Sequence, residues 1–350
     1  GHGVLISGAE QELNDFVDKT GIPVATTLLG MSAMDADHPL YVGWPGMHGN
    51  YGANVLTNSC DVLIAIGMRF DDRITGDLAS YAKQAKVVHI EIDPSEVDKN
   101  VKADAPVIGD AKSALKALLP LVNKNEHTEW RNEFKKYDAE EYDKIDKKDI
   151  FHDGDKIKMG EAVHMLSNKT KGEAVVVTDV GQHQMVTNRY YRFKKRNSIV
   201  TSGGAGTMGF ALPAAFGAKV ALPDREVIAI IGDGGFQMTL QELGTIAQSG
   251  LPVKIIILNN NFLGMVRQWQ ELFHARRYSF VELQNPDFIT IAKGFGIDGH
   301  KVEDRAELSA SLDTLLNSKT PYLLEIVCEK EGNVFPMVPA GGSVTNVRLE

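Results

Sequence analysis

Two short polar stretches, GDGG at residues 232–235 and NNN at residues 259–261, carry side chains that could do chemistry. Each closes an apolar run, and residues 235–258 separate GDG from NN. Asp233 and Asn260 offer a carboxylate oxygen and an amide oxygen. These hard ligands suit Mg²⁺ or Ca²⁺, and Mg²⁺ keeps further positions for phosphate oxygens. The pair therefore predicts a metal site that holds a phosphate.

Glycines surround this candidate site. Gly232, Gly234 and Gly235 let the backbone approach a ligand closely, and we expect a helix that begins near Phe236 to point its free amides at the same place. The stretch GGAGTMGFALPAAFGA at 203–218 repeats the design of a glycine-rich turn before a helix. GDGG alone also fits an ordinary turn, because Asp-Gly turns are common. Its pairing with NN makes the functional interpretation stronger.

Short apolar strands alternate with helical patterns throughout the chain. Strands are predicted at 23–28, 61–67, 86–92, 173–181, 225–234, 253–261 and 322–329. Such alternation predicts an α/β fold with two doubly wound parallel-sheet domains. Ligands of parallel sheets bind at the carboxyl ends of the strands. We therefore expect VGQHQM (180–185), the 203–209 loop, GDGG and NNNFLGM (259–265) to meet in one pocket.

The residues between the two sets of strands are rich in both signs of charge. Residues 123–160 are nearly free of aliphatic side chains, which indicates a solvated, partly helical connection. The predicted domains are 1–122 and 161–350, with 123–160 as a charged linker.

Composition excludes several function classes. A net charge of -9 provides no basic surface for nucleic acid or an anionic membrane, and no apolar run is long enough for a membrane helix. The two cysteines, Cys60 and Cys328, lie far apart in apolar surroundings, which favours two core residues in a reducing compartment. We expect a cytoplasmic protein.

Several motifs from both halves occur together. They are GMHGNYGAN (46–54), FDDR (70–73), GQHQM (181–185), SGGAGTMGFALPAA (202–215), the GDG and NN pair, NNNFLGMVRQWQELF (259–273) and VFPMVPAGG (334–342). The GDG and NN pair resembles the diphosphate-binding motif of thiamine-diphosphate enzymes. The whole set is similar to the large catalytic subunit of acetolactate synthase. The resemblance runs over the whole chain and implies an FAD-binding-like middle domain and a thiamine-diphosphate-binding C-terminal domain.

The resemblance implies specific ligands. The metal ligands would be Asp233, Asn260 and the main-chain carbonyl of Phe262. Thiamine diphosphate would contact Gly181, Gln182, His183, Gly206, Met208, Asp233, Gly234, Gly235, Asn260, Gly264, Met265 and Val266. Met208 would press the two cofactor rings into a bent form. On the residues alone, His183 also fits a satisfied histidine at a strand end.

The resemblance also implies substrate and flavin contacts. Arg73 would pair with the carboxylate of the acceptor keto acid, and Trp269 would shape the site for that acid. The pattern alone favours surface ion pairs in FDDR, and it equally fits a core tryptophan on an amphipathic helix. FAD would contact Thr27, Leu28, His48, Gly67, Arg69, Asp93 and Asp110, and Asp110 also fits a helix N-cap.

The implied activity is the decarboxylating condensation of pyruvate with pyruvate or 2-oxobutanoate in valine, leucine and isoleucine synthesis. The implied partners are 2-keto acids, a small regulatory subunit and further copies of the chain in a dimer or tetramer. The family's N-terminal domain, which supplies the glutamate that activates the cofactor, has no counterpart here. We therefore expect no catalytic residue in this chain and no acetolactate formation by it alone.

Other classes of function stay open at this point. Pyruvate oxidase, glyoxylate carboligase and keto-acid decarboxylases share the metal motif, although FDDR and LGMVRQWQ favour the synthase. A non-catalytic nucleotide-binding or scaffold module is the alternative from another class. Intact Asp233 and Asn260 argue against it.

Overall fold

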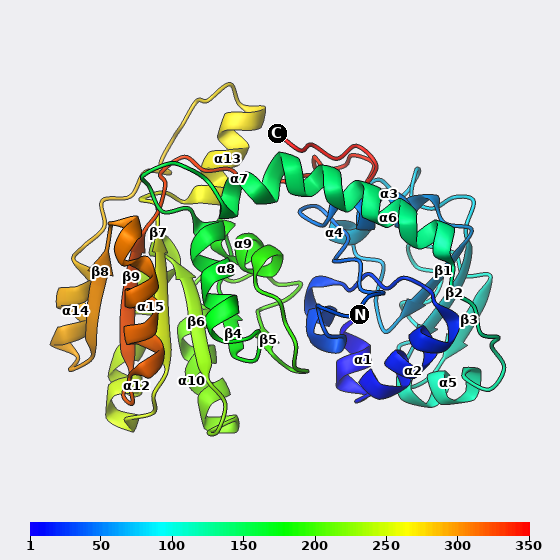
Figure 1. Cartoon of the computed structure of the whole chain (residues 1–350), viewed down its shortest axis with the longest axis horizontal. Helices are drawn as coiled ribbons and strands as arrows, with labels where there is room; N and C mark the ends of the chain where they lie inside the picture. Colours follow the sequence, from blue (N-terminus) through cyan, green and yellow to red (C-terminus); the bar gives the residue numbers. More distant parts are fainter. The chain divides into compact units, whose positions relative to one another are not determined.

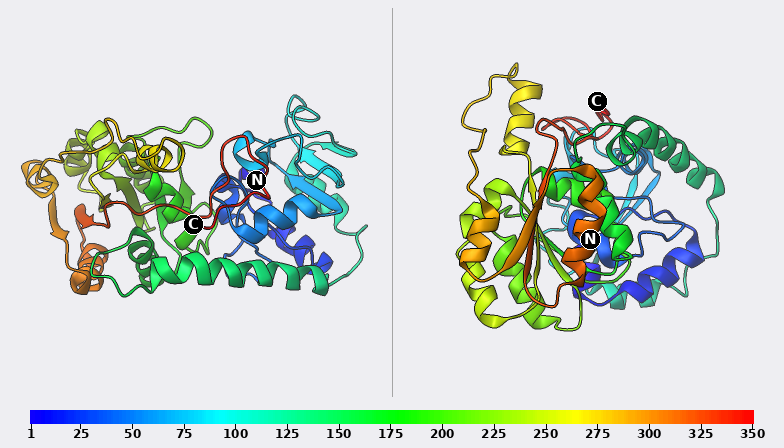
Figure 2. Two further views of the ribbon diagram at one scale, coloured as in Figure 1. Left: turned by 90° about the horizontal axis from the view of Figure 1, so that it is seen from above. Right: turned by 60° about the vertical axis from the view of Figure 1, so that its left-hand side comes forward.

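The computed structural model describes all 350 residues, and their contacts divide the chain into two compact units. Unit 1 contains residues 1–148, 193–197 and 335–350, whereas unit 2 contains residues 149–192 and 198–334. Figures 1 and 2 show parallel strands with helices packed against them in each unit. The α/β class predicted from the sequence is confirmed.

Unit 2 is built on a six-stranded parallel sheet with the order β5-β4-β6-β7-β9-β8. Its strands are β4 (Val175–Thr178), β5 (Ile199–Val200), β6 (Val227–Gly232), β7 (Lys254–Asn259), β8 (Asp298–Val302) and β9 (Tyr322–Val327). Every residue of β4, β6 and β7 is buried, as expected of central parallel strands. The four strands predicted in this half are confirmed, whereas β5 and β8 were not predicted.

Helices cover both faces of this sheet. The helices of unit 2 are α8 (Met159–Lys169), α9 (Gln182–Tyr190), α10 (Ala211–Ala221), α11 (Asp233–Thr239), α12 (Glu242–Ser249), α13 (Gly264–Phe273), α14 (Phe288–Gly294), the 3-10 turn η3 (Arg305–Glu307) and α15 (Leu308–Asn317). A core of buried residues from α10, α12 and α14 packs against one face. Figure 2 shows α15 on the opposite face. The sheet is therefore shielded from water on both sides.

The chain order places a switch point beside β4. The chain passes from β4 outward to β5 and then returns to the other side of β4 as β6. Crossovers that leave in opposite directions open a crevice at the carboxyl ends of the two strands. Asp233 follows β6 directly and Asn260 follows β7, its neighbour in the sheet. The helix predicted to begin near Phe236 begins at Asp233, so the aspartate is itself part of its first turn.

Unit 1 has a smaller parallel sheet with the order β1-β2-β3. Its strands are β1 (Val62–Ile66), β2 (Lys86–Glu91) and β3 (Ala105–Ile108), and its helices are α1 (His2–Ile6), α2 (Glu10–Thr20), η1 (Leu28–Ala33), α3 (Tyr51–Ser59), α4 (Asp72–Thr75), α5 (Ala111–Leu118), α6 (Thr128–Glu141) and the π-helical turn η2 (Tyr142–Asp146). α7 (Lys147–Ile150) passes from unit 1 to unit 2. The predicted strand at 23–28 is wrong, since only Val24 forms a bridge, with Tyr41.

The contacts divide the chain differently from the predicted segments. Most of 123–160 is helical and packs on unit 1: the Tyr137 ring lies edge-on to Tyr51 at 4.8 Å, and Glu141 accepts hydrogen bonds from Asn50 and from the Tyr51 amide. Residues 335–350 also group with unit 1, where Val338 N–H donates to Met47 O. Both attachments depend on contacts that are distant in sequence.

No helix combines the length and the apolar character needed to cross a lipid bilayer. The two cysteines form no disulfide, and Cys328 is buried whereas Cys60 is half-buried.

Candidate functional site

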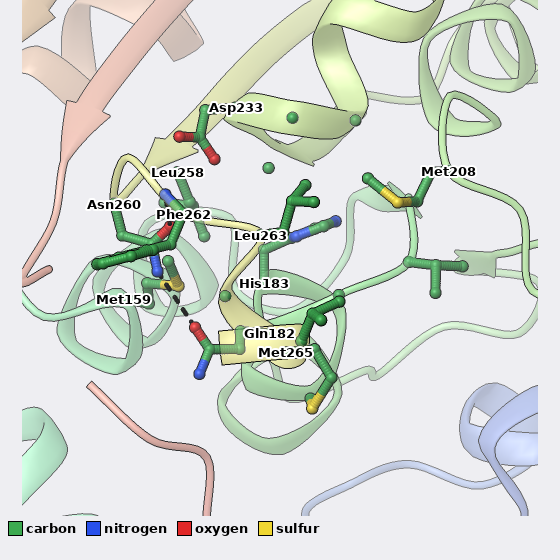
Figure 3. A pocket seen from close by; sticks show the side chains of 17 residues that line it. Met159, Gln182, His183, Met208, Asp233, Leu258, Asn260, Phe262, Leu263 and Met265 are labelled. Atoms are coloured by element: carbon green, nitrogen blue, oxygen red, sulfur yellow. Dashed lines mark hydrogen bonds between the residues drawn. The ribbon is translucent and has the colours of Figure 1, made fainter. Parts of the chain in front are cut away.

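One pocket lies at the carboxyl ends of β4, β6 and β7. It holds about 430 Å³ of empty space, part of it open to solvent. Its lining includes every residue predicted to contact thiamine diphosphate except Gly206, and it includes Phe262. Gly206 lies exposed in the loop before α10. Figure 3 shows the labelled side chains around this space.

Asp233 is the only charged residue of the pocket. Its side chain is almost fully buried, and its Oδ2 accepts a hydrogen bond of 2.7 Å from Asn285 Nδ2. Burial raises the pKa of Asp233 to about 6, against the opposing effect of the hydrogen bonds it accepts. No arginine or lysine lines the pocket. A divalent cation would stabilise the ionised form of such a buried carboxylate, which has no positive partner of its own.

Asn260 is oriented by Gln182. The Nδ2 group of Asn260 donates to Gln182 Oε1 at 3.1 Å, as the dashed line in Figure 3 shows. Both donor hydrogens of Gln182 are used in turn, because its Nε2 donates to Gln268 Oε1 at 3.0 Å and to Gly332 O at 2.9 Å. This arrangement fixes which end of the Asn260 amide is the oxygen, and it keeps that oxygen away from Gln182.

The backbone N–H and C=O groups of Phe262 point to the side on which Asn260 lies. It forms an antiparallel bridge with Glu282, in which the flanking bonds run from Leu263 N–H to Val281 O and from Leu283 N–H to Asn261 O. The N–H and C=O of Phe262 therefore point away from that partner segment. Consistent with this, Phe262 N–H donates to Asn260 Oδ1 at 3.3 Å. The Phe262 carbonyl, which points to the same side as its N–H, therefore also lies on the Asn260 side of this segment.

His183 is the second residue of α9 and is 5% exposed. Burial lowers the pKa of His183 to about 3, so the ring is neutral at physiological pH. Its Nε2 is buried without a hydrogen-bond partner. A neutral imidazole can donate from this nitrogen, and an oxygen of a bound ligand would satisfy it.

Asp179 binds the end of the glycine-rich loop, and Gly235 packs closely against Asp179. Asp179 is fully buried, and its carboxylate accepts from Gly209 N–H at 2.9 Å and from Ala211 N–H at 2.8 Å. A Cβ on Gly235 would lie 2.0 Å from Asp179 Oδ2. Glycine is therefore required at 235 by the close approach of α11 to Asp179. A Cβ on Gly264 would likewise lie 2.1 Å from Gln182 Oε1.

Comparison with family models identifies the fold. Residues 1–118 match the central domain of thiamine pyrophosphate enzymes, and residues 179–326 match their C-terminal TPP binding domain. The chain belongs to the thiamine pyrophosphate enzymes. The second match contains almost all of the pocket described above.

Individual relatives show which thiamine pyrophosphate enzymes the chain is similar to. The acetolactate synthase isozyme 2 large subunit of Escherichia coli is 43% identical over 98% of this chain and 61% of that protein. A probable acetolactate synthase large subunit of Methanocaldococcus jannaschii is 44% identical over 99% of this chain and 59% of that protein. The acetolactate synthase large subunit of Lactococcus lactis is 41% identical over 97% of the chain and 59% of that protein. The resemblance to this family is confirmed, and the chain spans about three fifths of the length of these curated relatives.

The central domain contains the candidate flavin contacts. Gly67, Asp93 and Asp110 follow β1, β2 and β3, so they lie at the carboxyl edge of that sheet. The Asp110 carboxylate caps α5 by accepting from Ser113 N–H at 2.9 Å, as the N-cap interpretation predicts. Thr27 precedes η1 and Leu28 begins it, Arg69 lies in the loop after β1, and His48 is buried. Flavin binding by these residues stays a prediction.

Arg73 and Arg69 each form an ion pair with an aspartate of the FDDR motif. Arg73 Nη1 lies 2.7 Å from Asp72 Oδ2, and Arg69 Nη2 lies 3.0 Å from Asp71 Oδ2. Both guanidiniums are exposed, which is the ion-pair arrangement that the pattern alone allowed. Arg73 also lines a second cavity, in unit 1, together with Met47, Val338 and other residues.

Trp269 lies on α13 but does not line the pocket. It is half-buried, and its ring lies 4.9 Å from the Phe273 ring. Its predicted role toward the second keto acid therefore receives no support from contacts within unit 2.

Several residues around the pocket were not predicted. Met159, Leu258 and Leu263 contribute apolar wall, and Asp179 and Asn285 position other groups. A signal for Asp179 was present, because it is a polar residue at the end of a buried strand, as Asp233 is. Asn285 belongs to no motif of this kind.

Proposed function

We propose that this chain provides the metal- and diphosphate-binding half of the thiamine diphosphate site of an acetolactate synthase large subunit. The observation that carries the proposal is the convergence of buried Asp233, Asn260 and Phe262 at the ends of β6 and β7 in a pocket without arginine or lysine. An anionic diphosphate is stable beside Asp233 only with a cation between them. Full-length relatives named acetolactate synthase support the specific activity.

The proposed ligands have separate tasks. The Asp233 carboxylate, the Asn260 amide oxygen and the Phe262 carbonyl hold Mg²⁺. α9 and α13 begin at the pocket, so their first backbone N–H groups are available to phosphate oxygens. His183 donates from Nε2 to the same ligand. Met208 and Leu263 supply an apolar wall. Met208 would support a bent form of the cofactor when it is bound.

When bound, thiamine diphosphate supplies the electron sink for decarboxylation of a 2-keto acid. The contribution of this chain is to orient the cofactor and to exclude water from it. We propose that pyruvate is the donor and that pyruvate or 2-oxobutanoate is the acceptor, with Arg73 pairing with the acceptor carboxylate and Trp269 shaping its site. The activating acid is not proposed to be in this chain, so pyruvate given to it alone should yield no acetolactate in a colorimetric assay.

The central domain is proposed to bind FAD through the residues at the carboxyl edge of its sheet. A small regulatory subunit and a homodimer or homotetramer are proposed as partners, because the relatives are named as large subunits. The cytoplasmic location stays a prediction. Pyruvate oxidase, glyoxylate carboligase and keto-acid decarboxylases have the weaker support, since the matched relatives are named acetolactate synthases.

Isothermal titration of thiamine diphosphate into the chain tests the proposal. We expect binding with Mg²⁺, and loss of binding after chelation of the metal or in Asp233→Ala. The exposed Asp224 on the loop before β6 provides the matched control, so Asp224→Ala should bind as the parent does. Failure of the folded parent to bind, or equal binding by Asp233→Ala, would contradict the proposal.

A further inference from the structure

The loop that carries Asn260 and Phe262 is held by a segment we call the strap, residues 281–285. The strap runs antiparallel to residues 261–263 through the Leu263 and Leu283 amides described above. It lies between α13 and α14 in the chain and has no predicted motif. The strap also contacts the helix that bears Asp233, because a Cβ on Gly234 would lie 3.2 Å from Leu283 Cδ1.

One side chain of the strap reaches both strand ends. Asn285 Nδ2 lies 2.7 Å from Asp233 Oδ2, 3.0 Å from Asn259 Oδ1 and 3.1 Å from Asn261 Oδ1. Its own Oδ1 accepts from Gln237 Nε2 at 2.9 Å. Each polar atom of the Asn285 amide is therefore engaged, and the orientation of the amide is fixed.

This network extends away from the pocket. Asn259 Nδ2 donates to the buried Glu325 at 2.7 Å, so Asn259 cannot turn its oxygen away from Asn285 without losing that bond. Asn285 is held by α11 through Gln237 and by β7 through Asn259. A partner held in this way fixes the rotamer of the carboxylate that it contacts. Groups that hydrogen-bond to the ligands of a metal site act in the same manner.

We propose that Asn285 is the positioning residue of the cation site: it holds Asp233 Oδ2 and thereby presents Oδ1 to the metal. This inference rests on the proposed function. It assigns a role to a residue 52 positions away from Asp233 in the sequence. Asn285 does not itself touch the cation, and it acts through the geometry of Asp233.

Binding of Mn²⁺ in the presence of thiamine diphosphate tests the role without any turnover. Free Mn²⁺ is counted by electron paramagnetic resonance. For Asn285→Leu, which keeps the branched shape and the number of heavy atoms and removes the hydrogen bonds, we expect the Mn²⁺ dissociation constant to rise by about 10- to 100-fold. Gln284→Leu, on the exposed neighbouring position of the strap, is the matched control and should leave the constant unchanged.

A double substitution separates positioning from general stabilisation. In an Asp233→Asn background, Asn285→Leu should weaken Mn²⁺ binding no further, because the carboxylate that it positions is gone. Equal losses in the two backgrounds, or parent-like binding by Asn285→Leu, would overturn the inference while leaving the proposed function intact. A folded parent that binds neither Mn²⁺ nor thiamine diphosphate would overturn both.

A second variant covers the case in which Asn285→Leu does not fold. Gln237→Leu leaves Asn285 in place and removes the bond to its Oδ1, together with a longer bond of 3.4 Å from Gln237 Nε2 to the Asp233 main-chain carbonyl. We expect a smaller, severalfold rise in the Mn²⁺ dissociation constant that also disappears in the Asp233→Asn background. Persistence of the full effect in that background would overturn the inference.

Discussion

Replacing His183 by glutamine tests the electrostatics of the pocket. The His183 ring is 5% exposed, and burial lowers its pKa from 6.5 to about 3. Its position in the first turn of α9 acts in the same direction, since the positive end of a helix disfavours an imidazolium. The folded chain therefore excludes a proton that the unfolded chain binds readily below pH 6.5.

The cost of this exclusion follows from linkage. Because the folded pKa is the lower one, His183 leaves stability unaffected above pH 6.5 and reduces it as the pH falls toward 3. At pH 5.0 the reduction is about 2 kcal/mol, from a slope of about 1.4 kcal/mol per pH unit below 6.5. Glutamine does not titrate. The free energy of unfolding of His183→Gln should therefore fall less than that of the parent between pH 7.5 and pH 5.0, by about 2 kcal/mol.

Urea unfolding followed by circular dichroism at the two pH values measures this difference, and the parent provides the reference for all other titrating groups. His274, which is exposed on the loop after α13, provides the control, and His274→Gln should parallel the parent. Proton NMR gives an independent check, because the His183 resonance should not titrate between pH 5 and 8. A His183 titration centred near 6.5, or parallel curves for parent and His183→Gln, would refute the reasoning.

Three further predictions concern packing and reactivity. Gly235→Ala places a Cβ 2.0 Å from Asp179 Oδ2 and should lower the free energy of unfolding by about 2 to 4 kcal/mol in urea. Gly217→Ala, with no atom near the new Cβ on an exposed face of α10, should raise it by about 0.5 to 1 kcal/mol, and a loss there would contradict the steric argument. Phe288→Ala empties a fully buried position and should cost about 3 to 5 kcal/mol in the same assay; a change below about 1 kcal/mol would show that the core collapses around it. Burial raises the pKa of Cys60 to about 11, so at pH 8 its thiol should react with an aromatic disulfide at least about tenfold more slowly than free cysteine, and an equal rate would contradict the burial.

The sequence allowed prediction of the central strands because each is an uninterrupted apolar run between polar residues. It also allowed prediction of Asp233, Asn260 and the glycines, since polar residues at the ends of such runs must lie at one edge of a parallel sheet. The edge strands β5 and β8 of unit 2 could not be found in this way. β8 reads DGHKV and is partly exposed, so it has no apolar run. Conversely, residues 23–28 have the composition of a strand but find one bridge only, at Val24, because strand formation depends on an available neighbour.

The sequence by itself therefore determined the fold class, the edge of the sheet where the pocket lies, and the residues whose oxygen atoms are proposed to hold a cation. Only the tertiary structure decided how those atoms are aimed. Asn285 and Gln182 orient Asp233 and Asn260 across separations of 52 and 78 residues. The tertiary structure also decided that residues 335–350 group with unit 1. The physical reason is that a local pattern specifies which face or end of an element is polar, whereas hydrogen-bond partners depend on which distant segments the fold brings within about 3 Å.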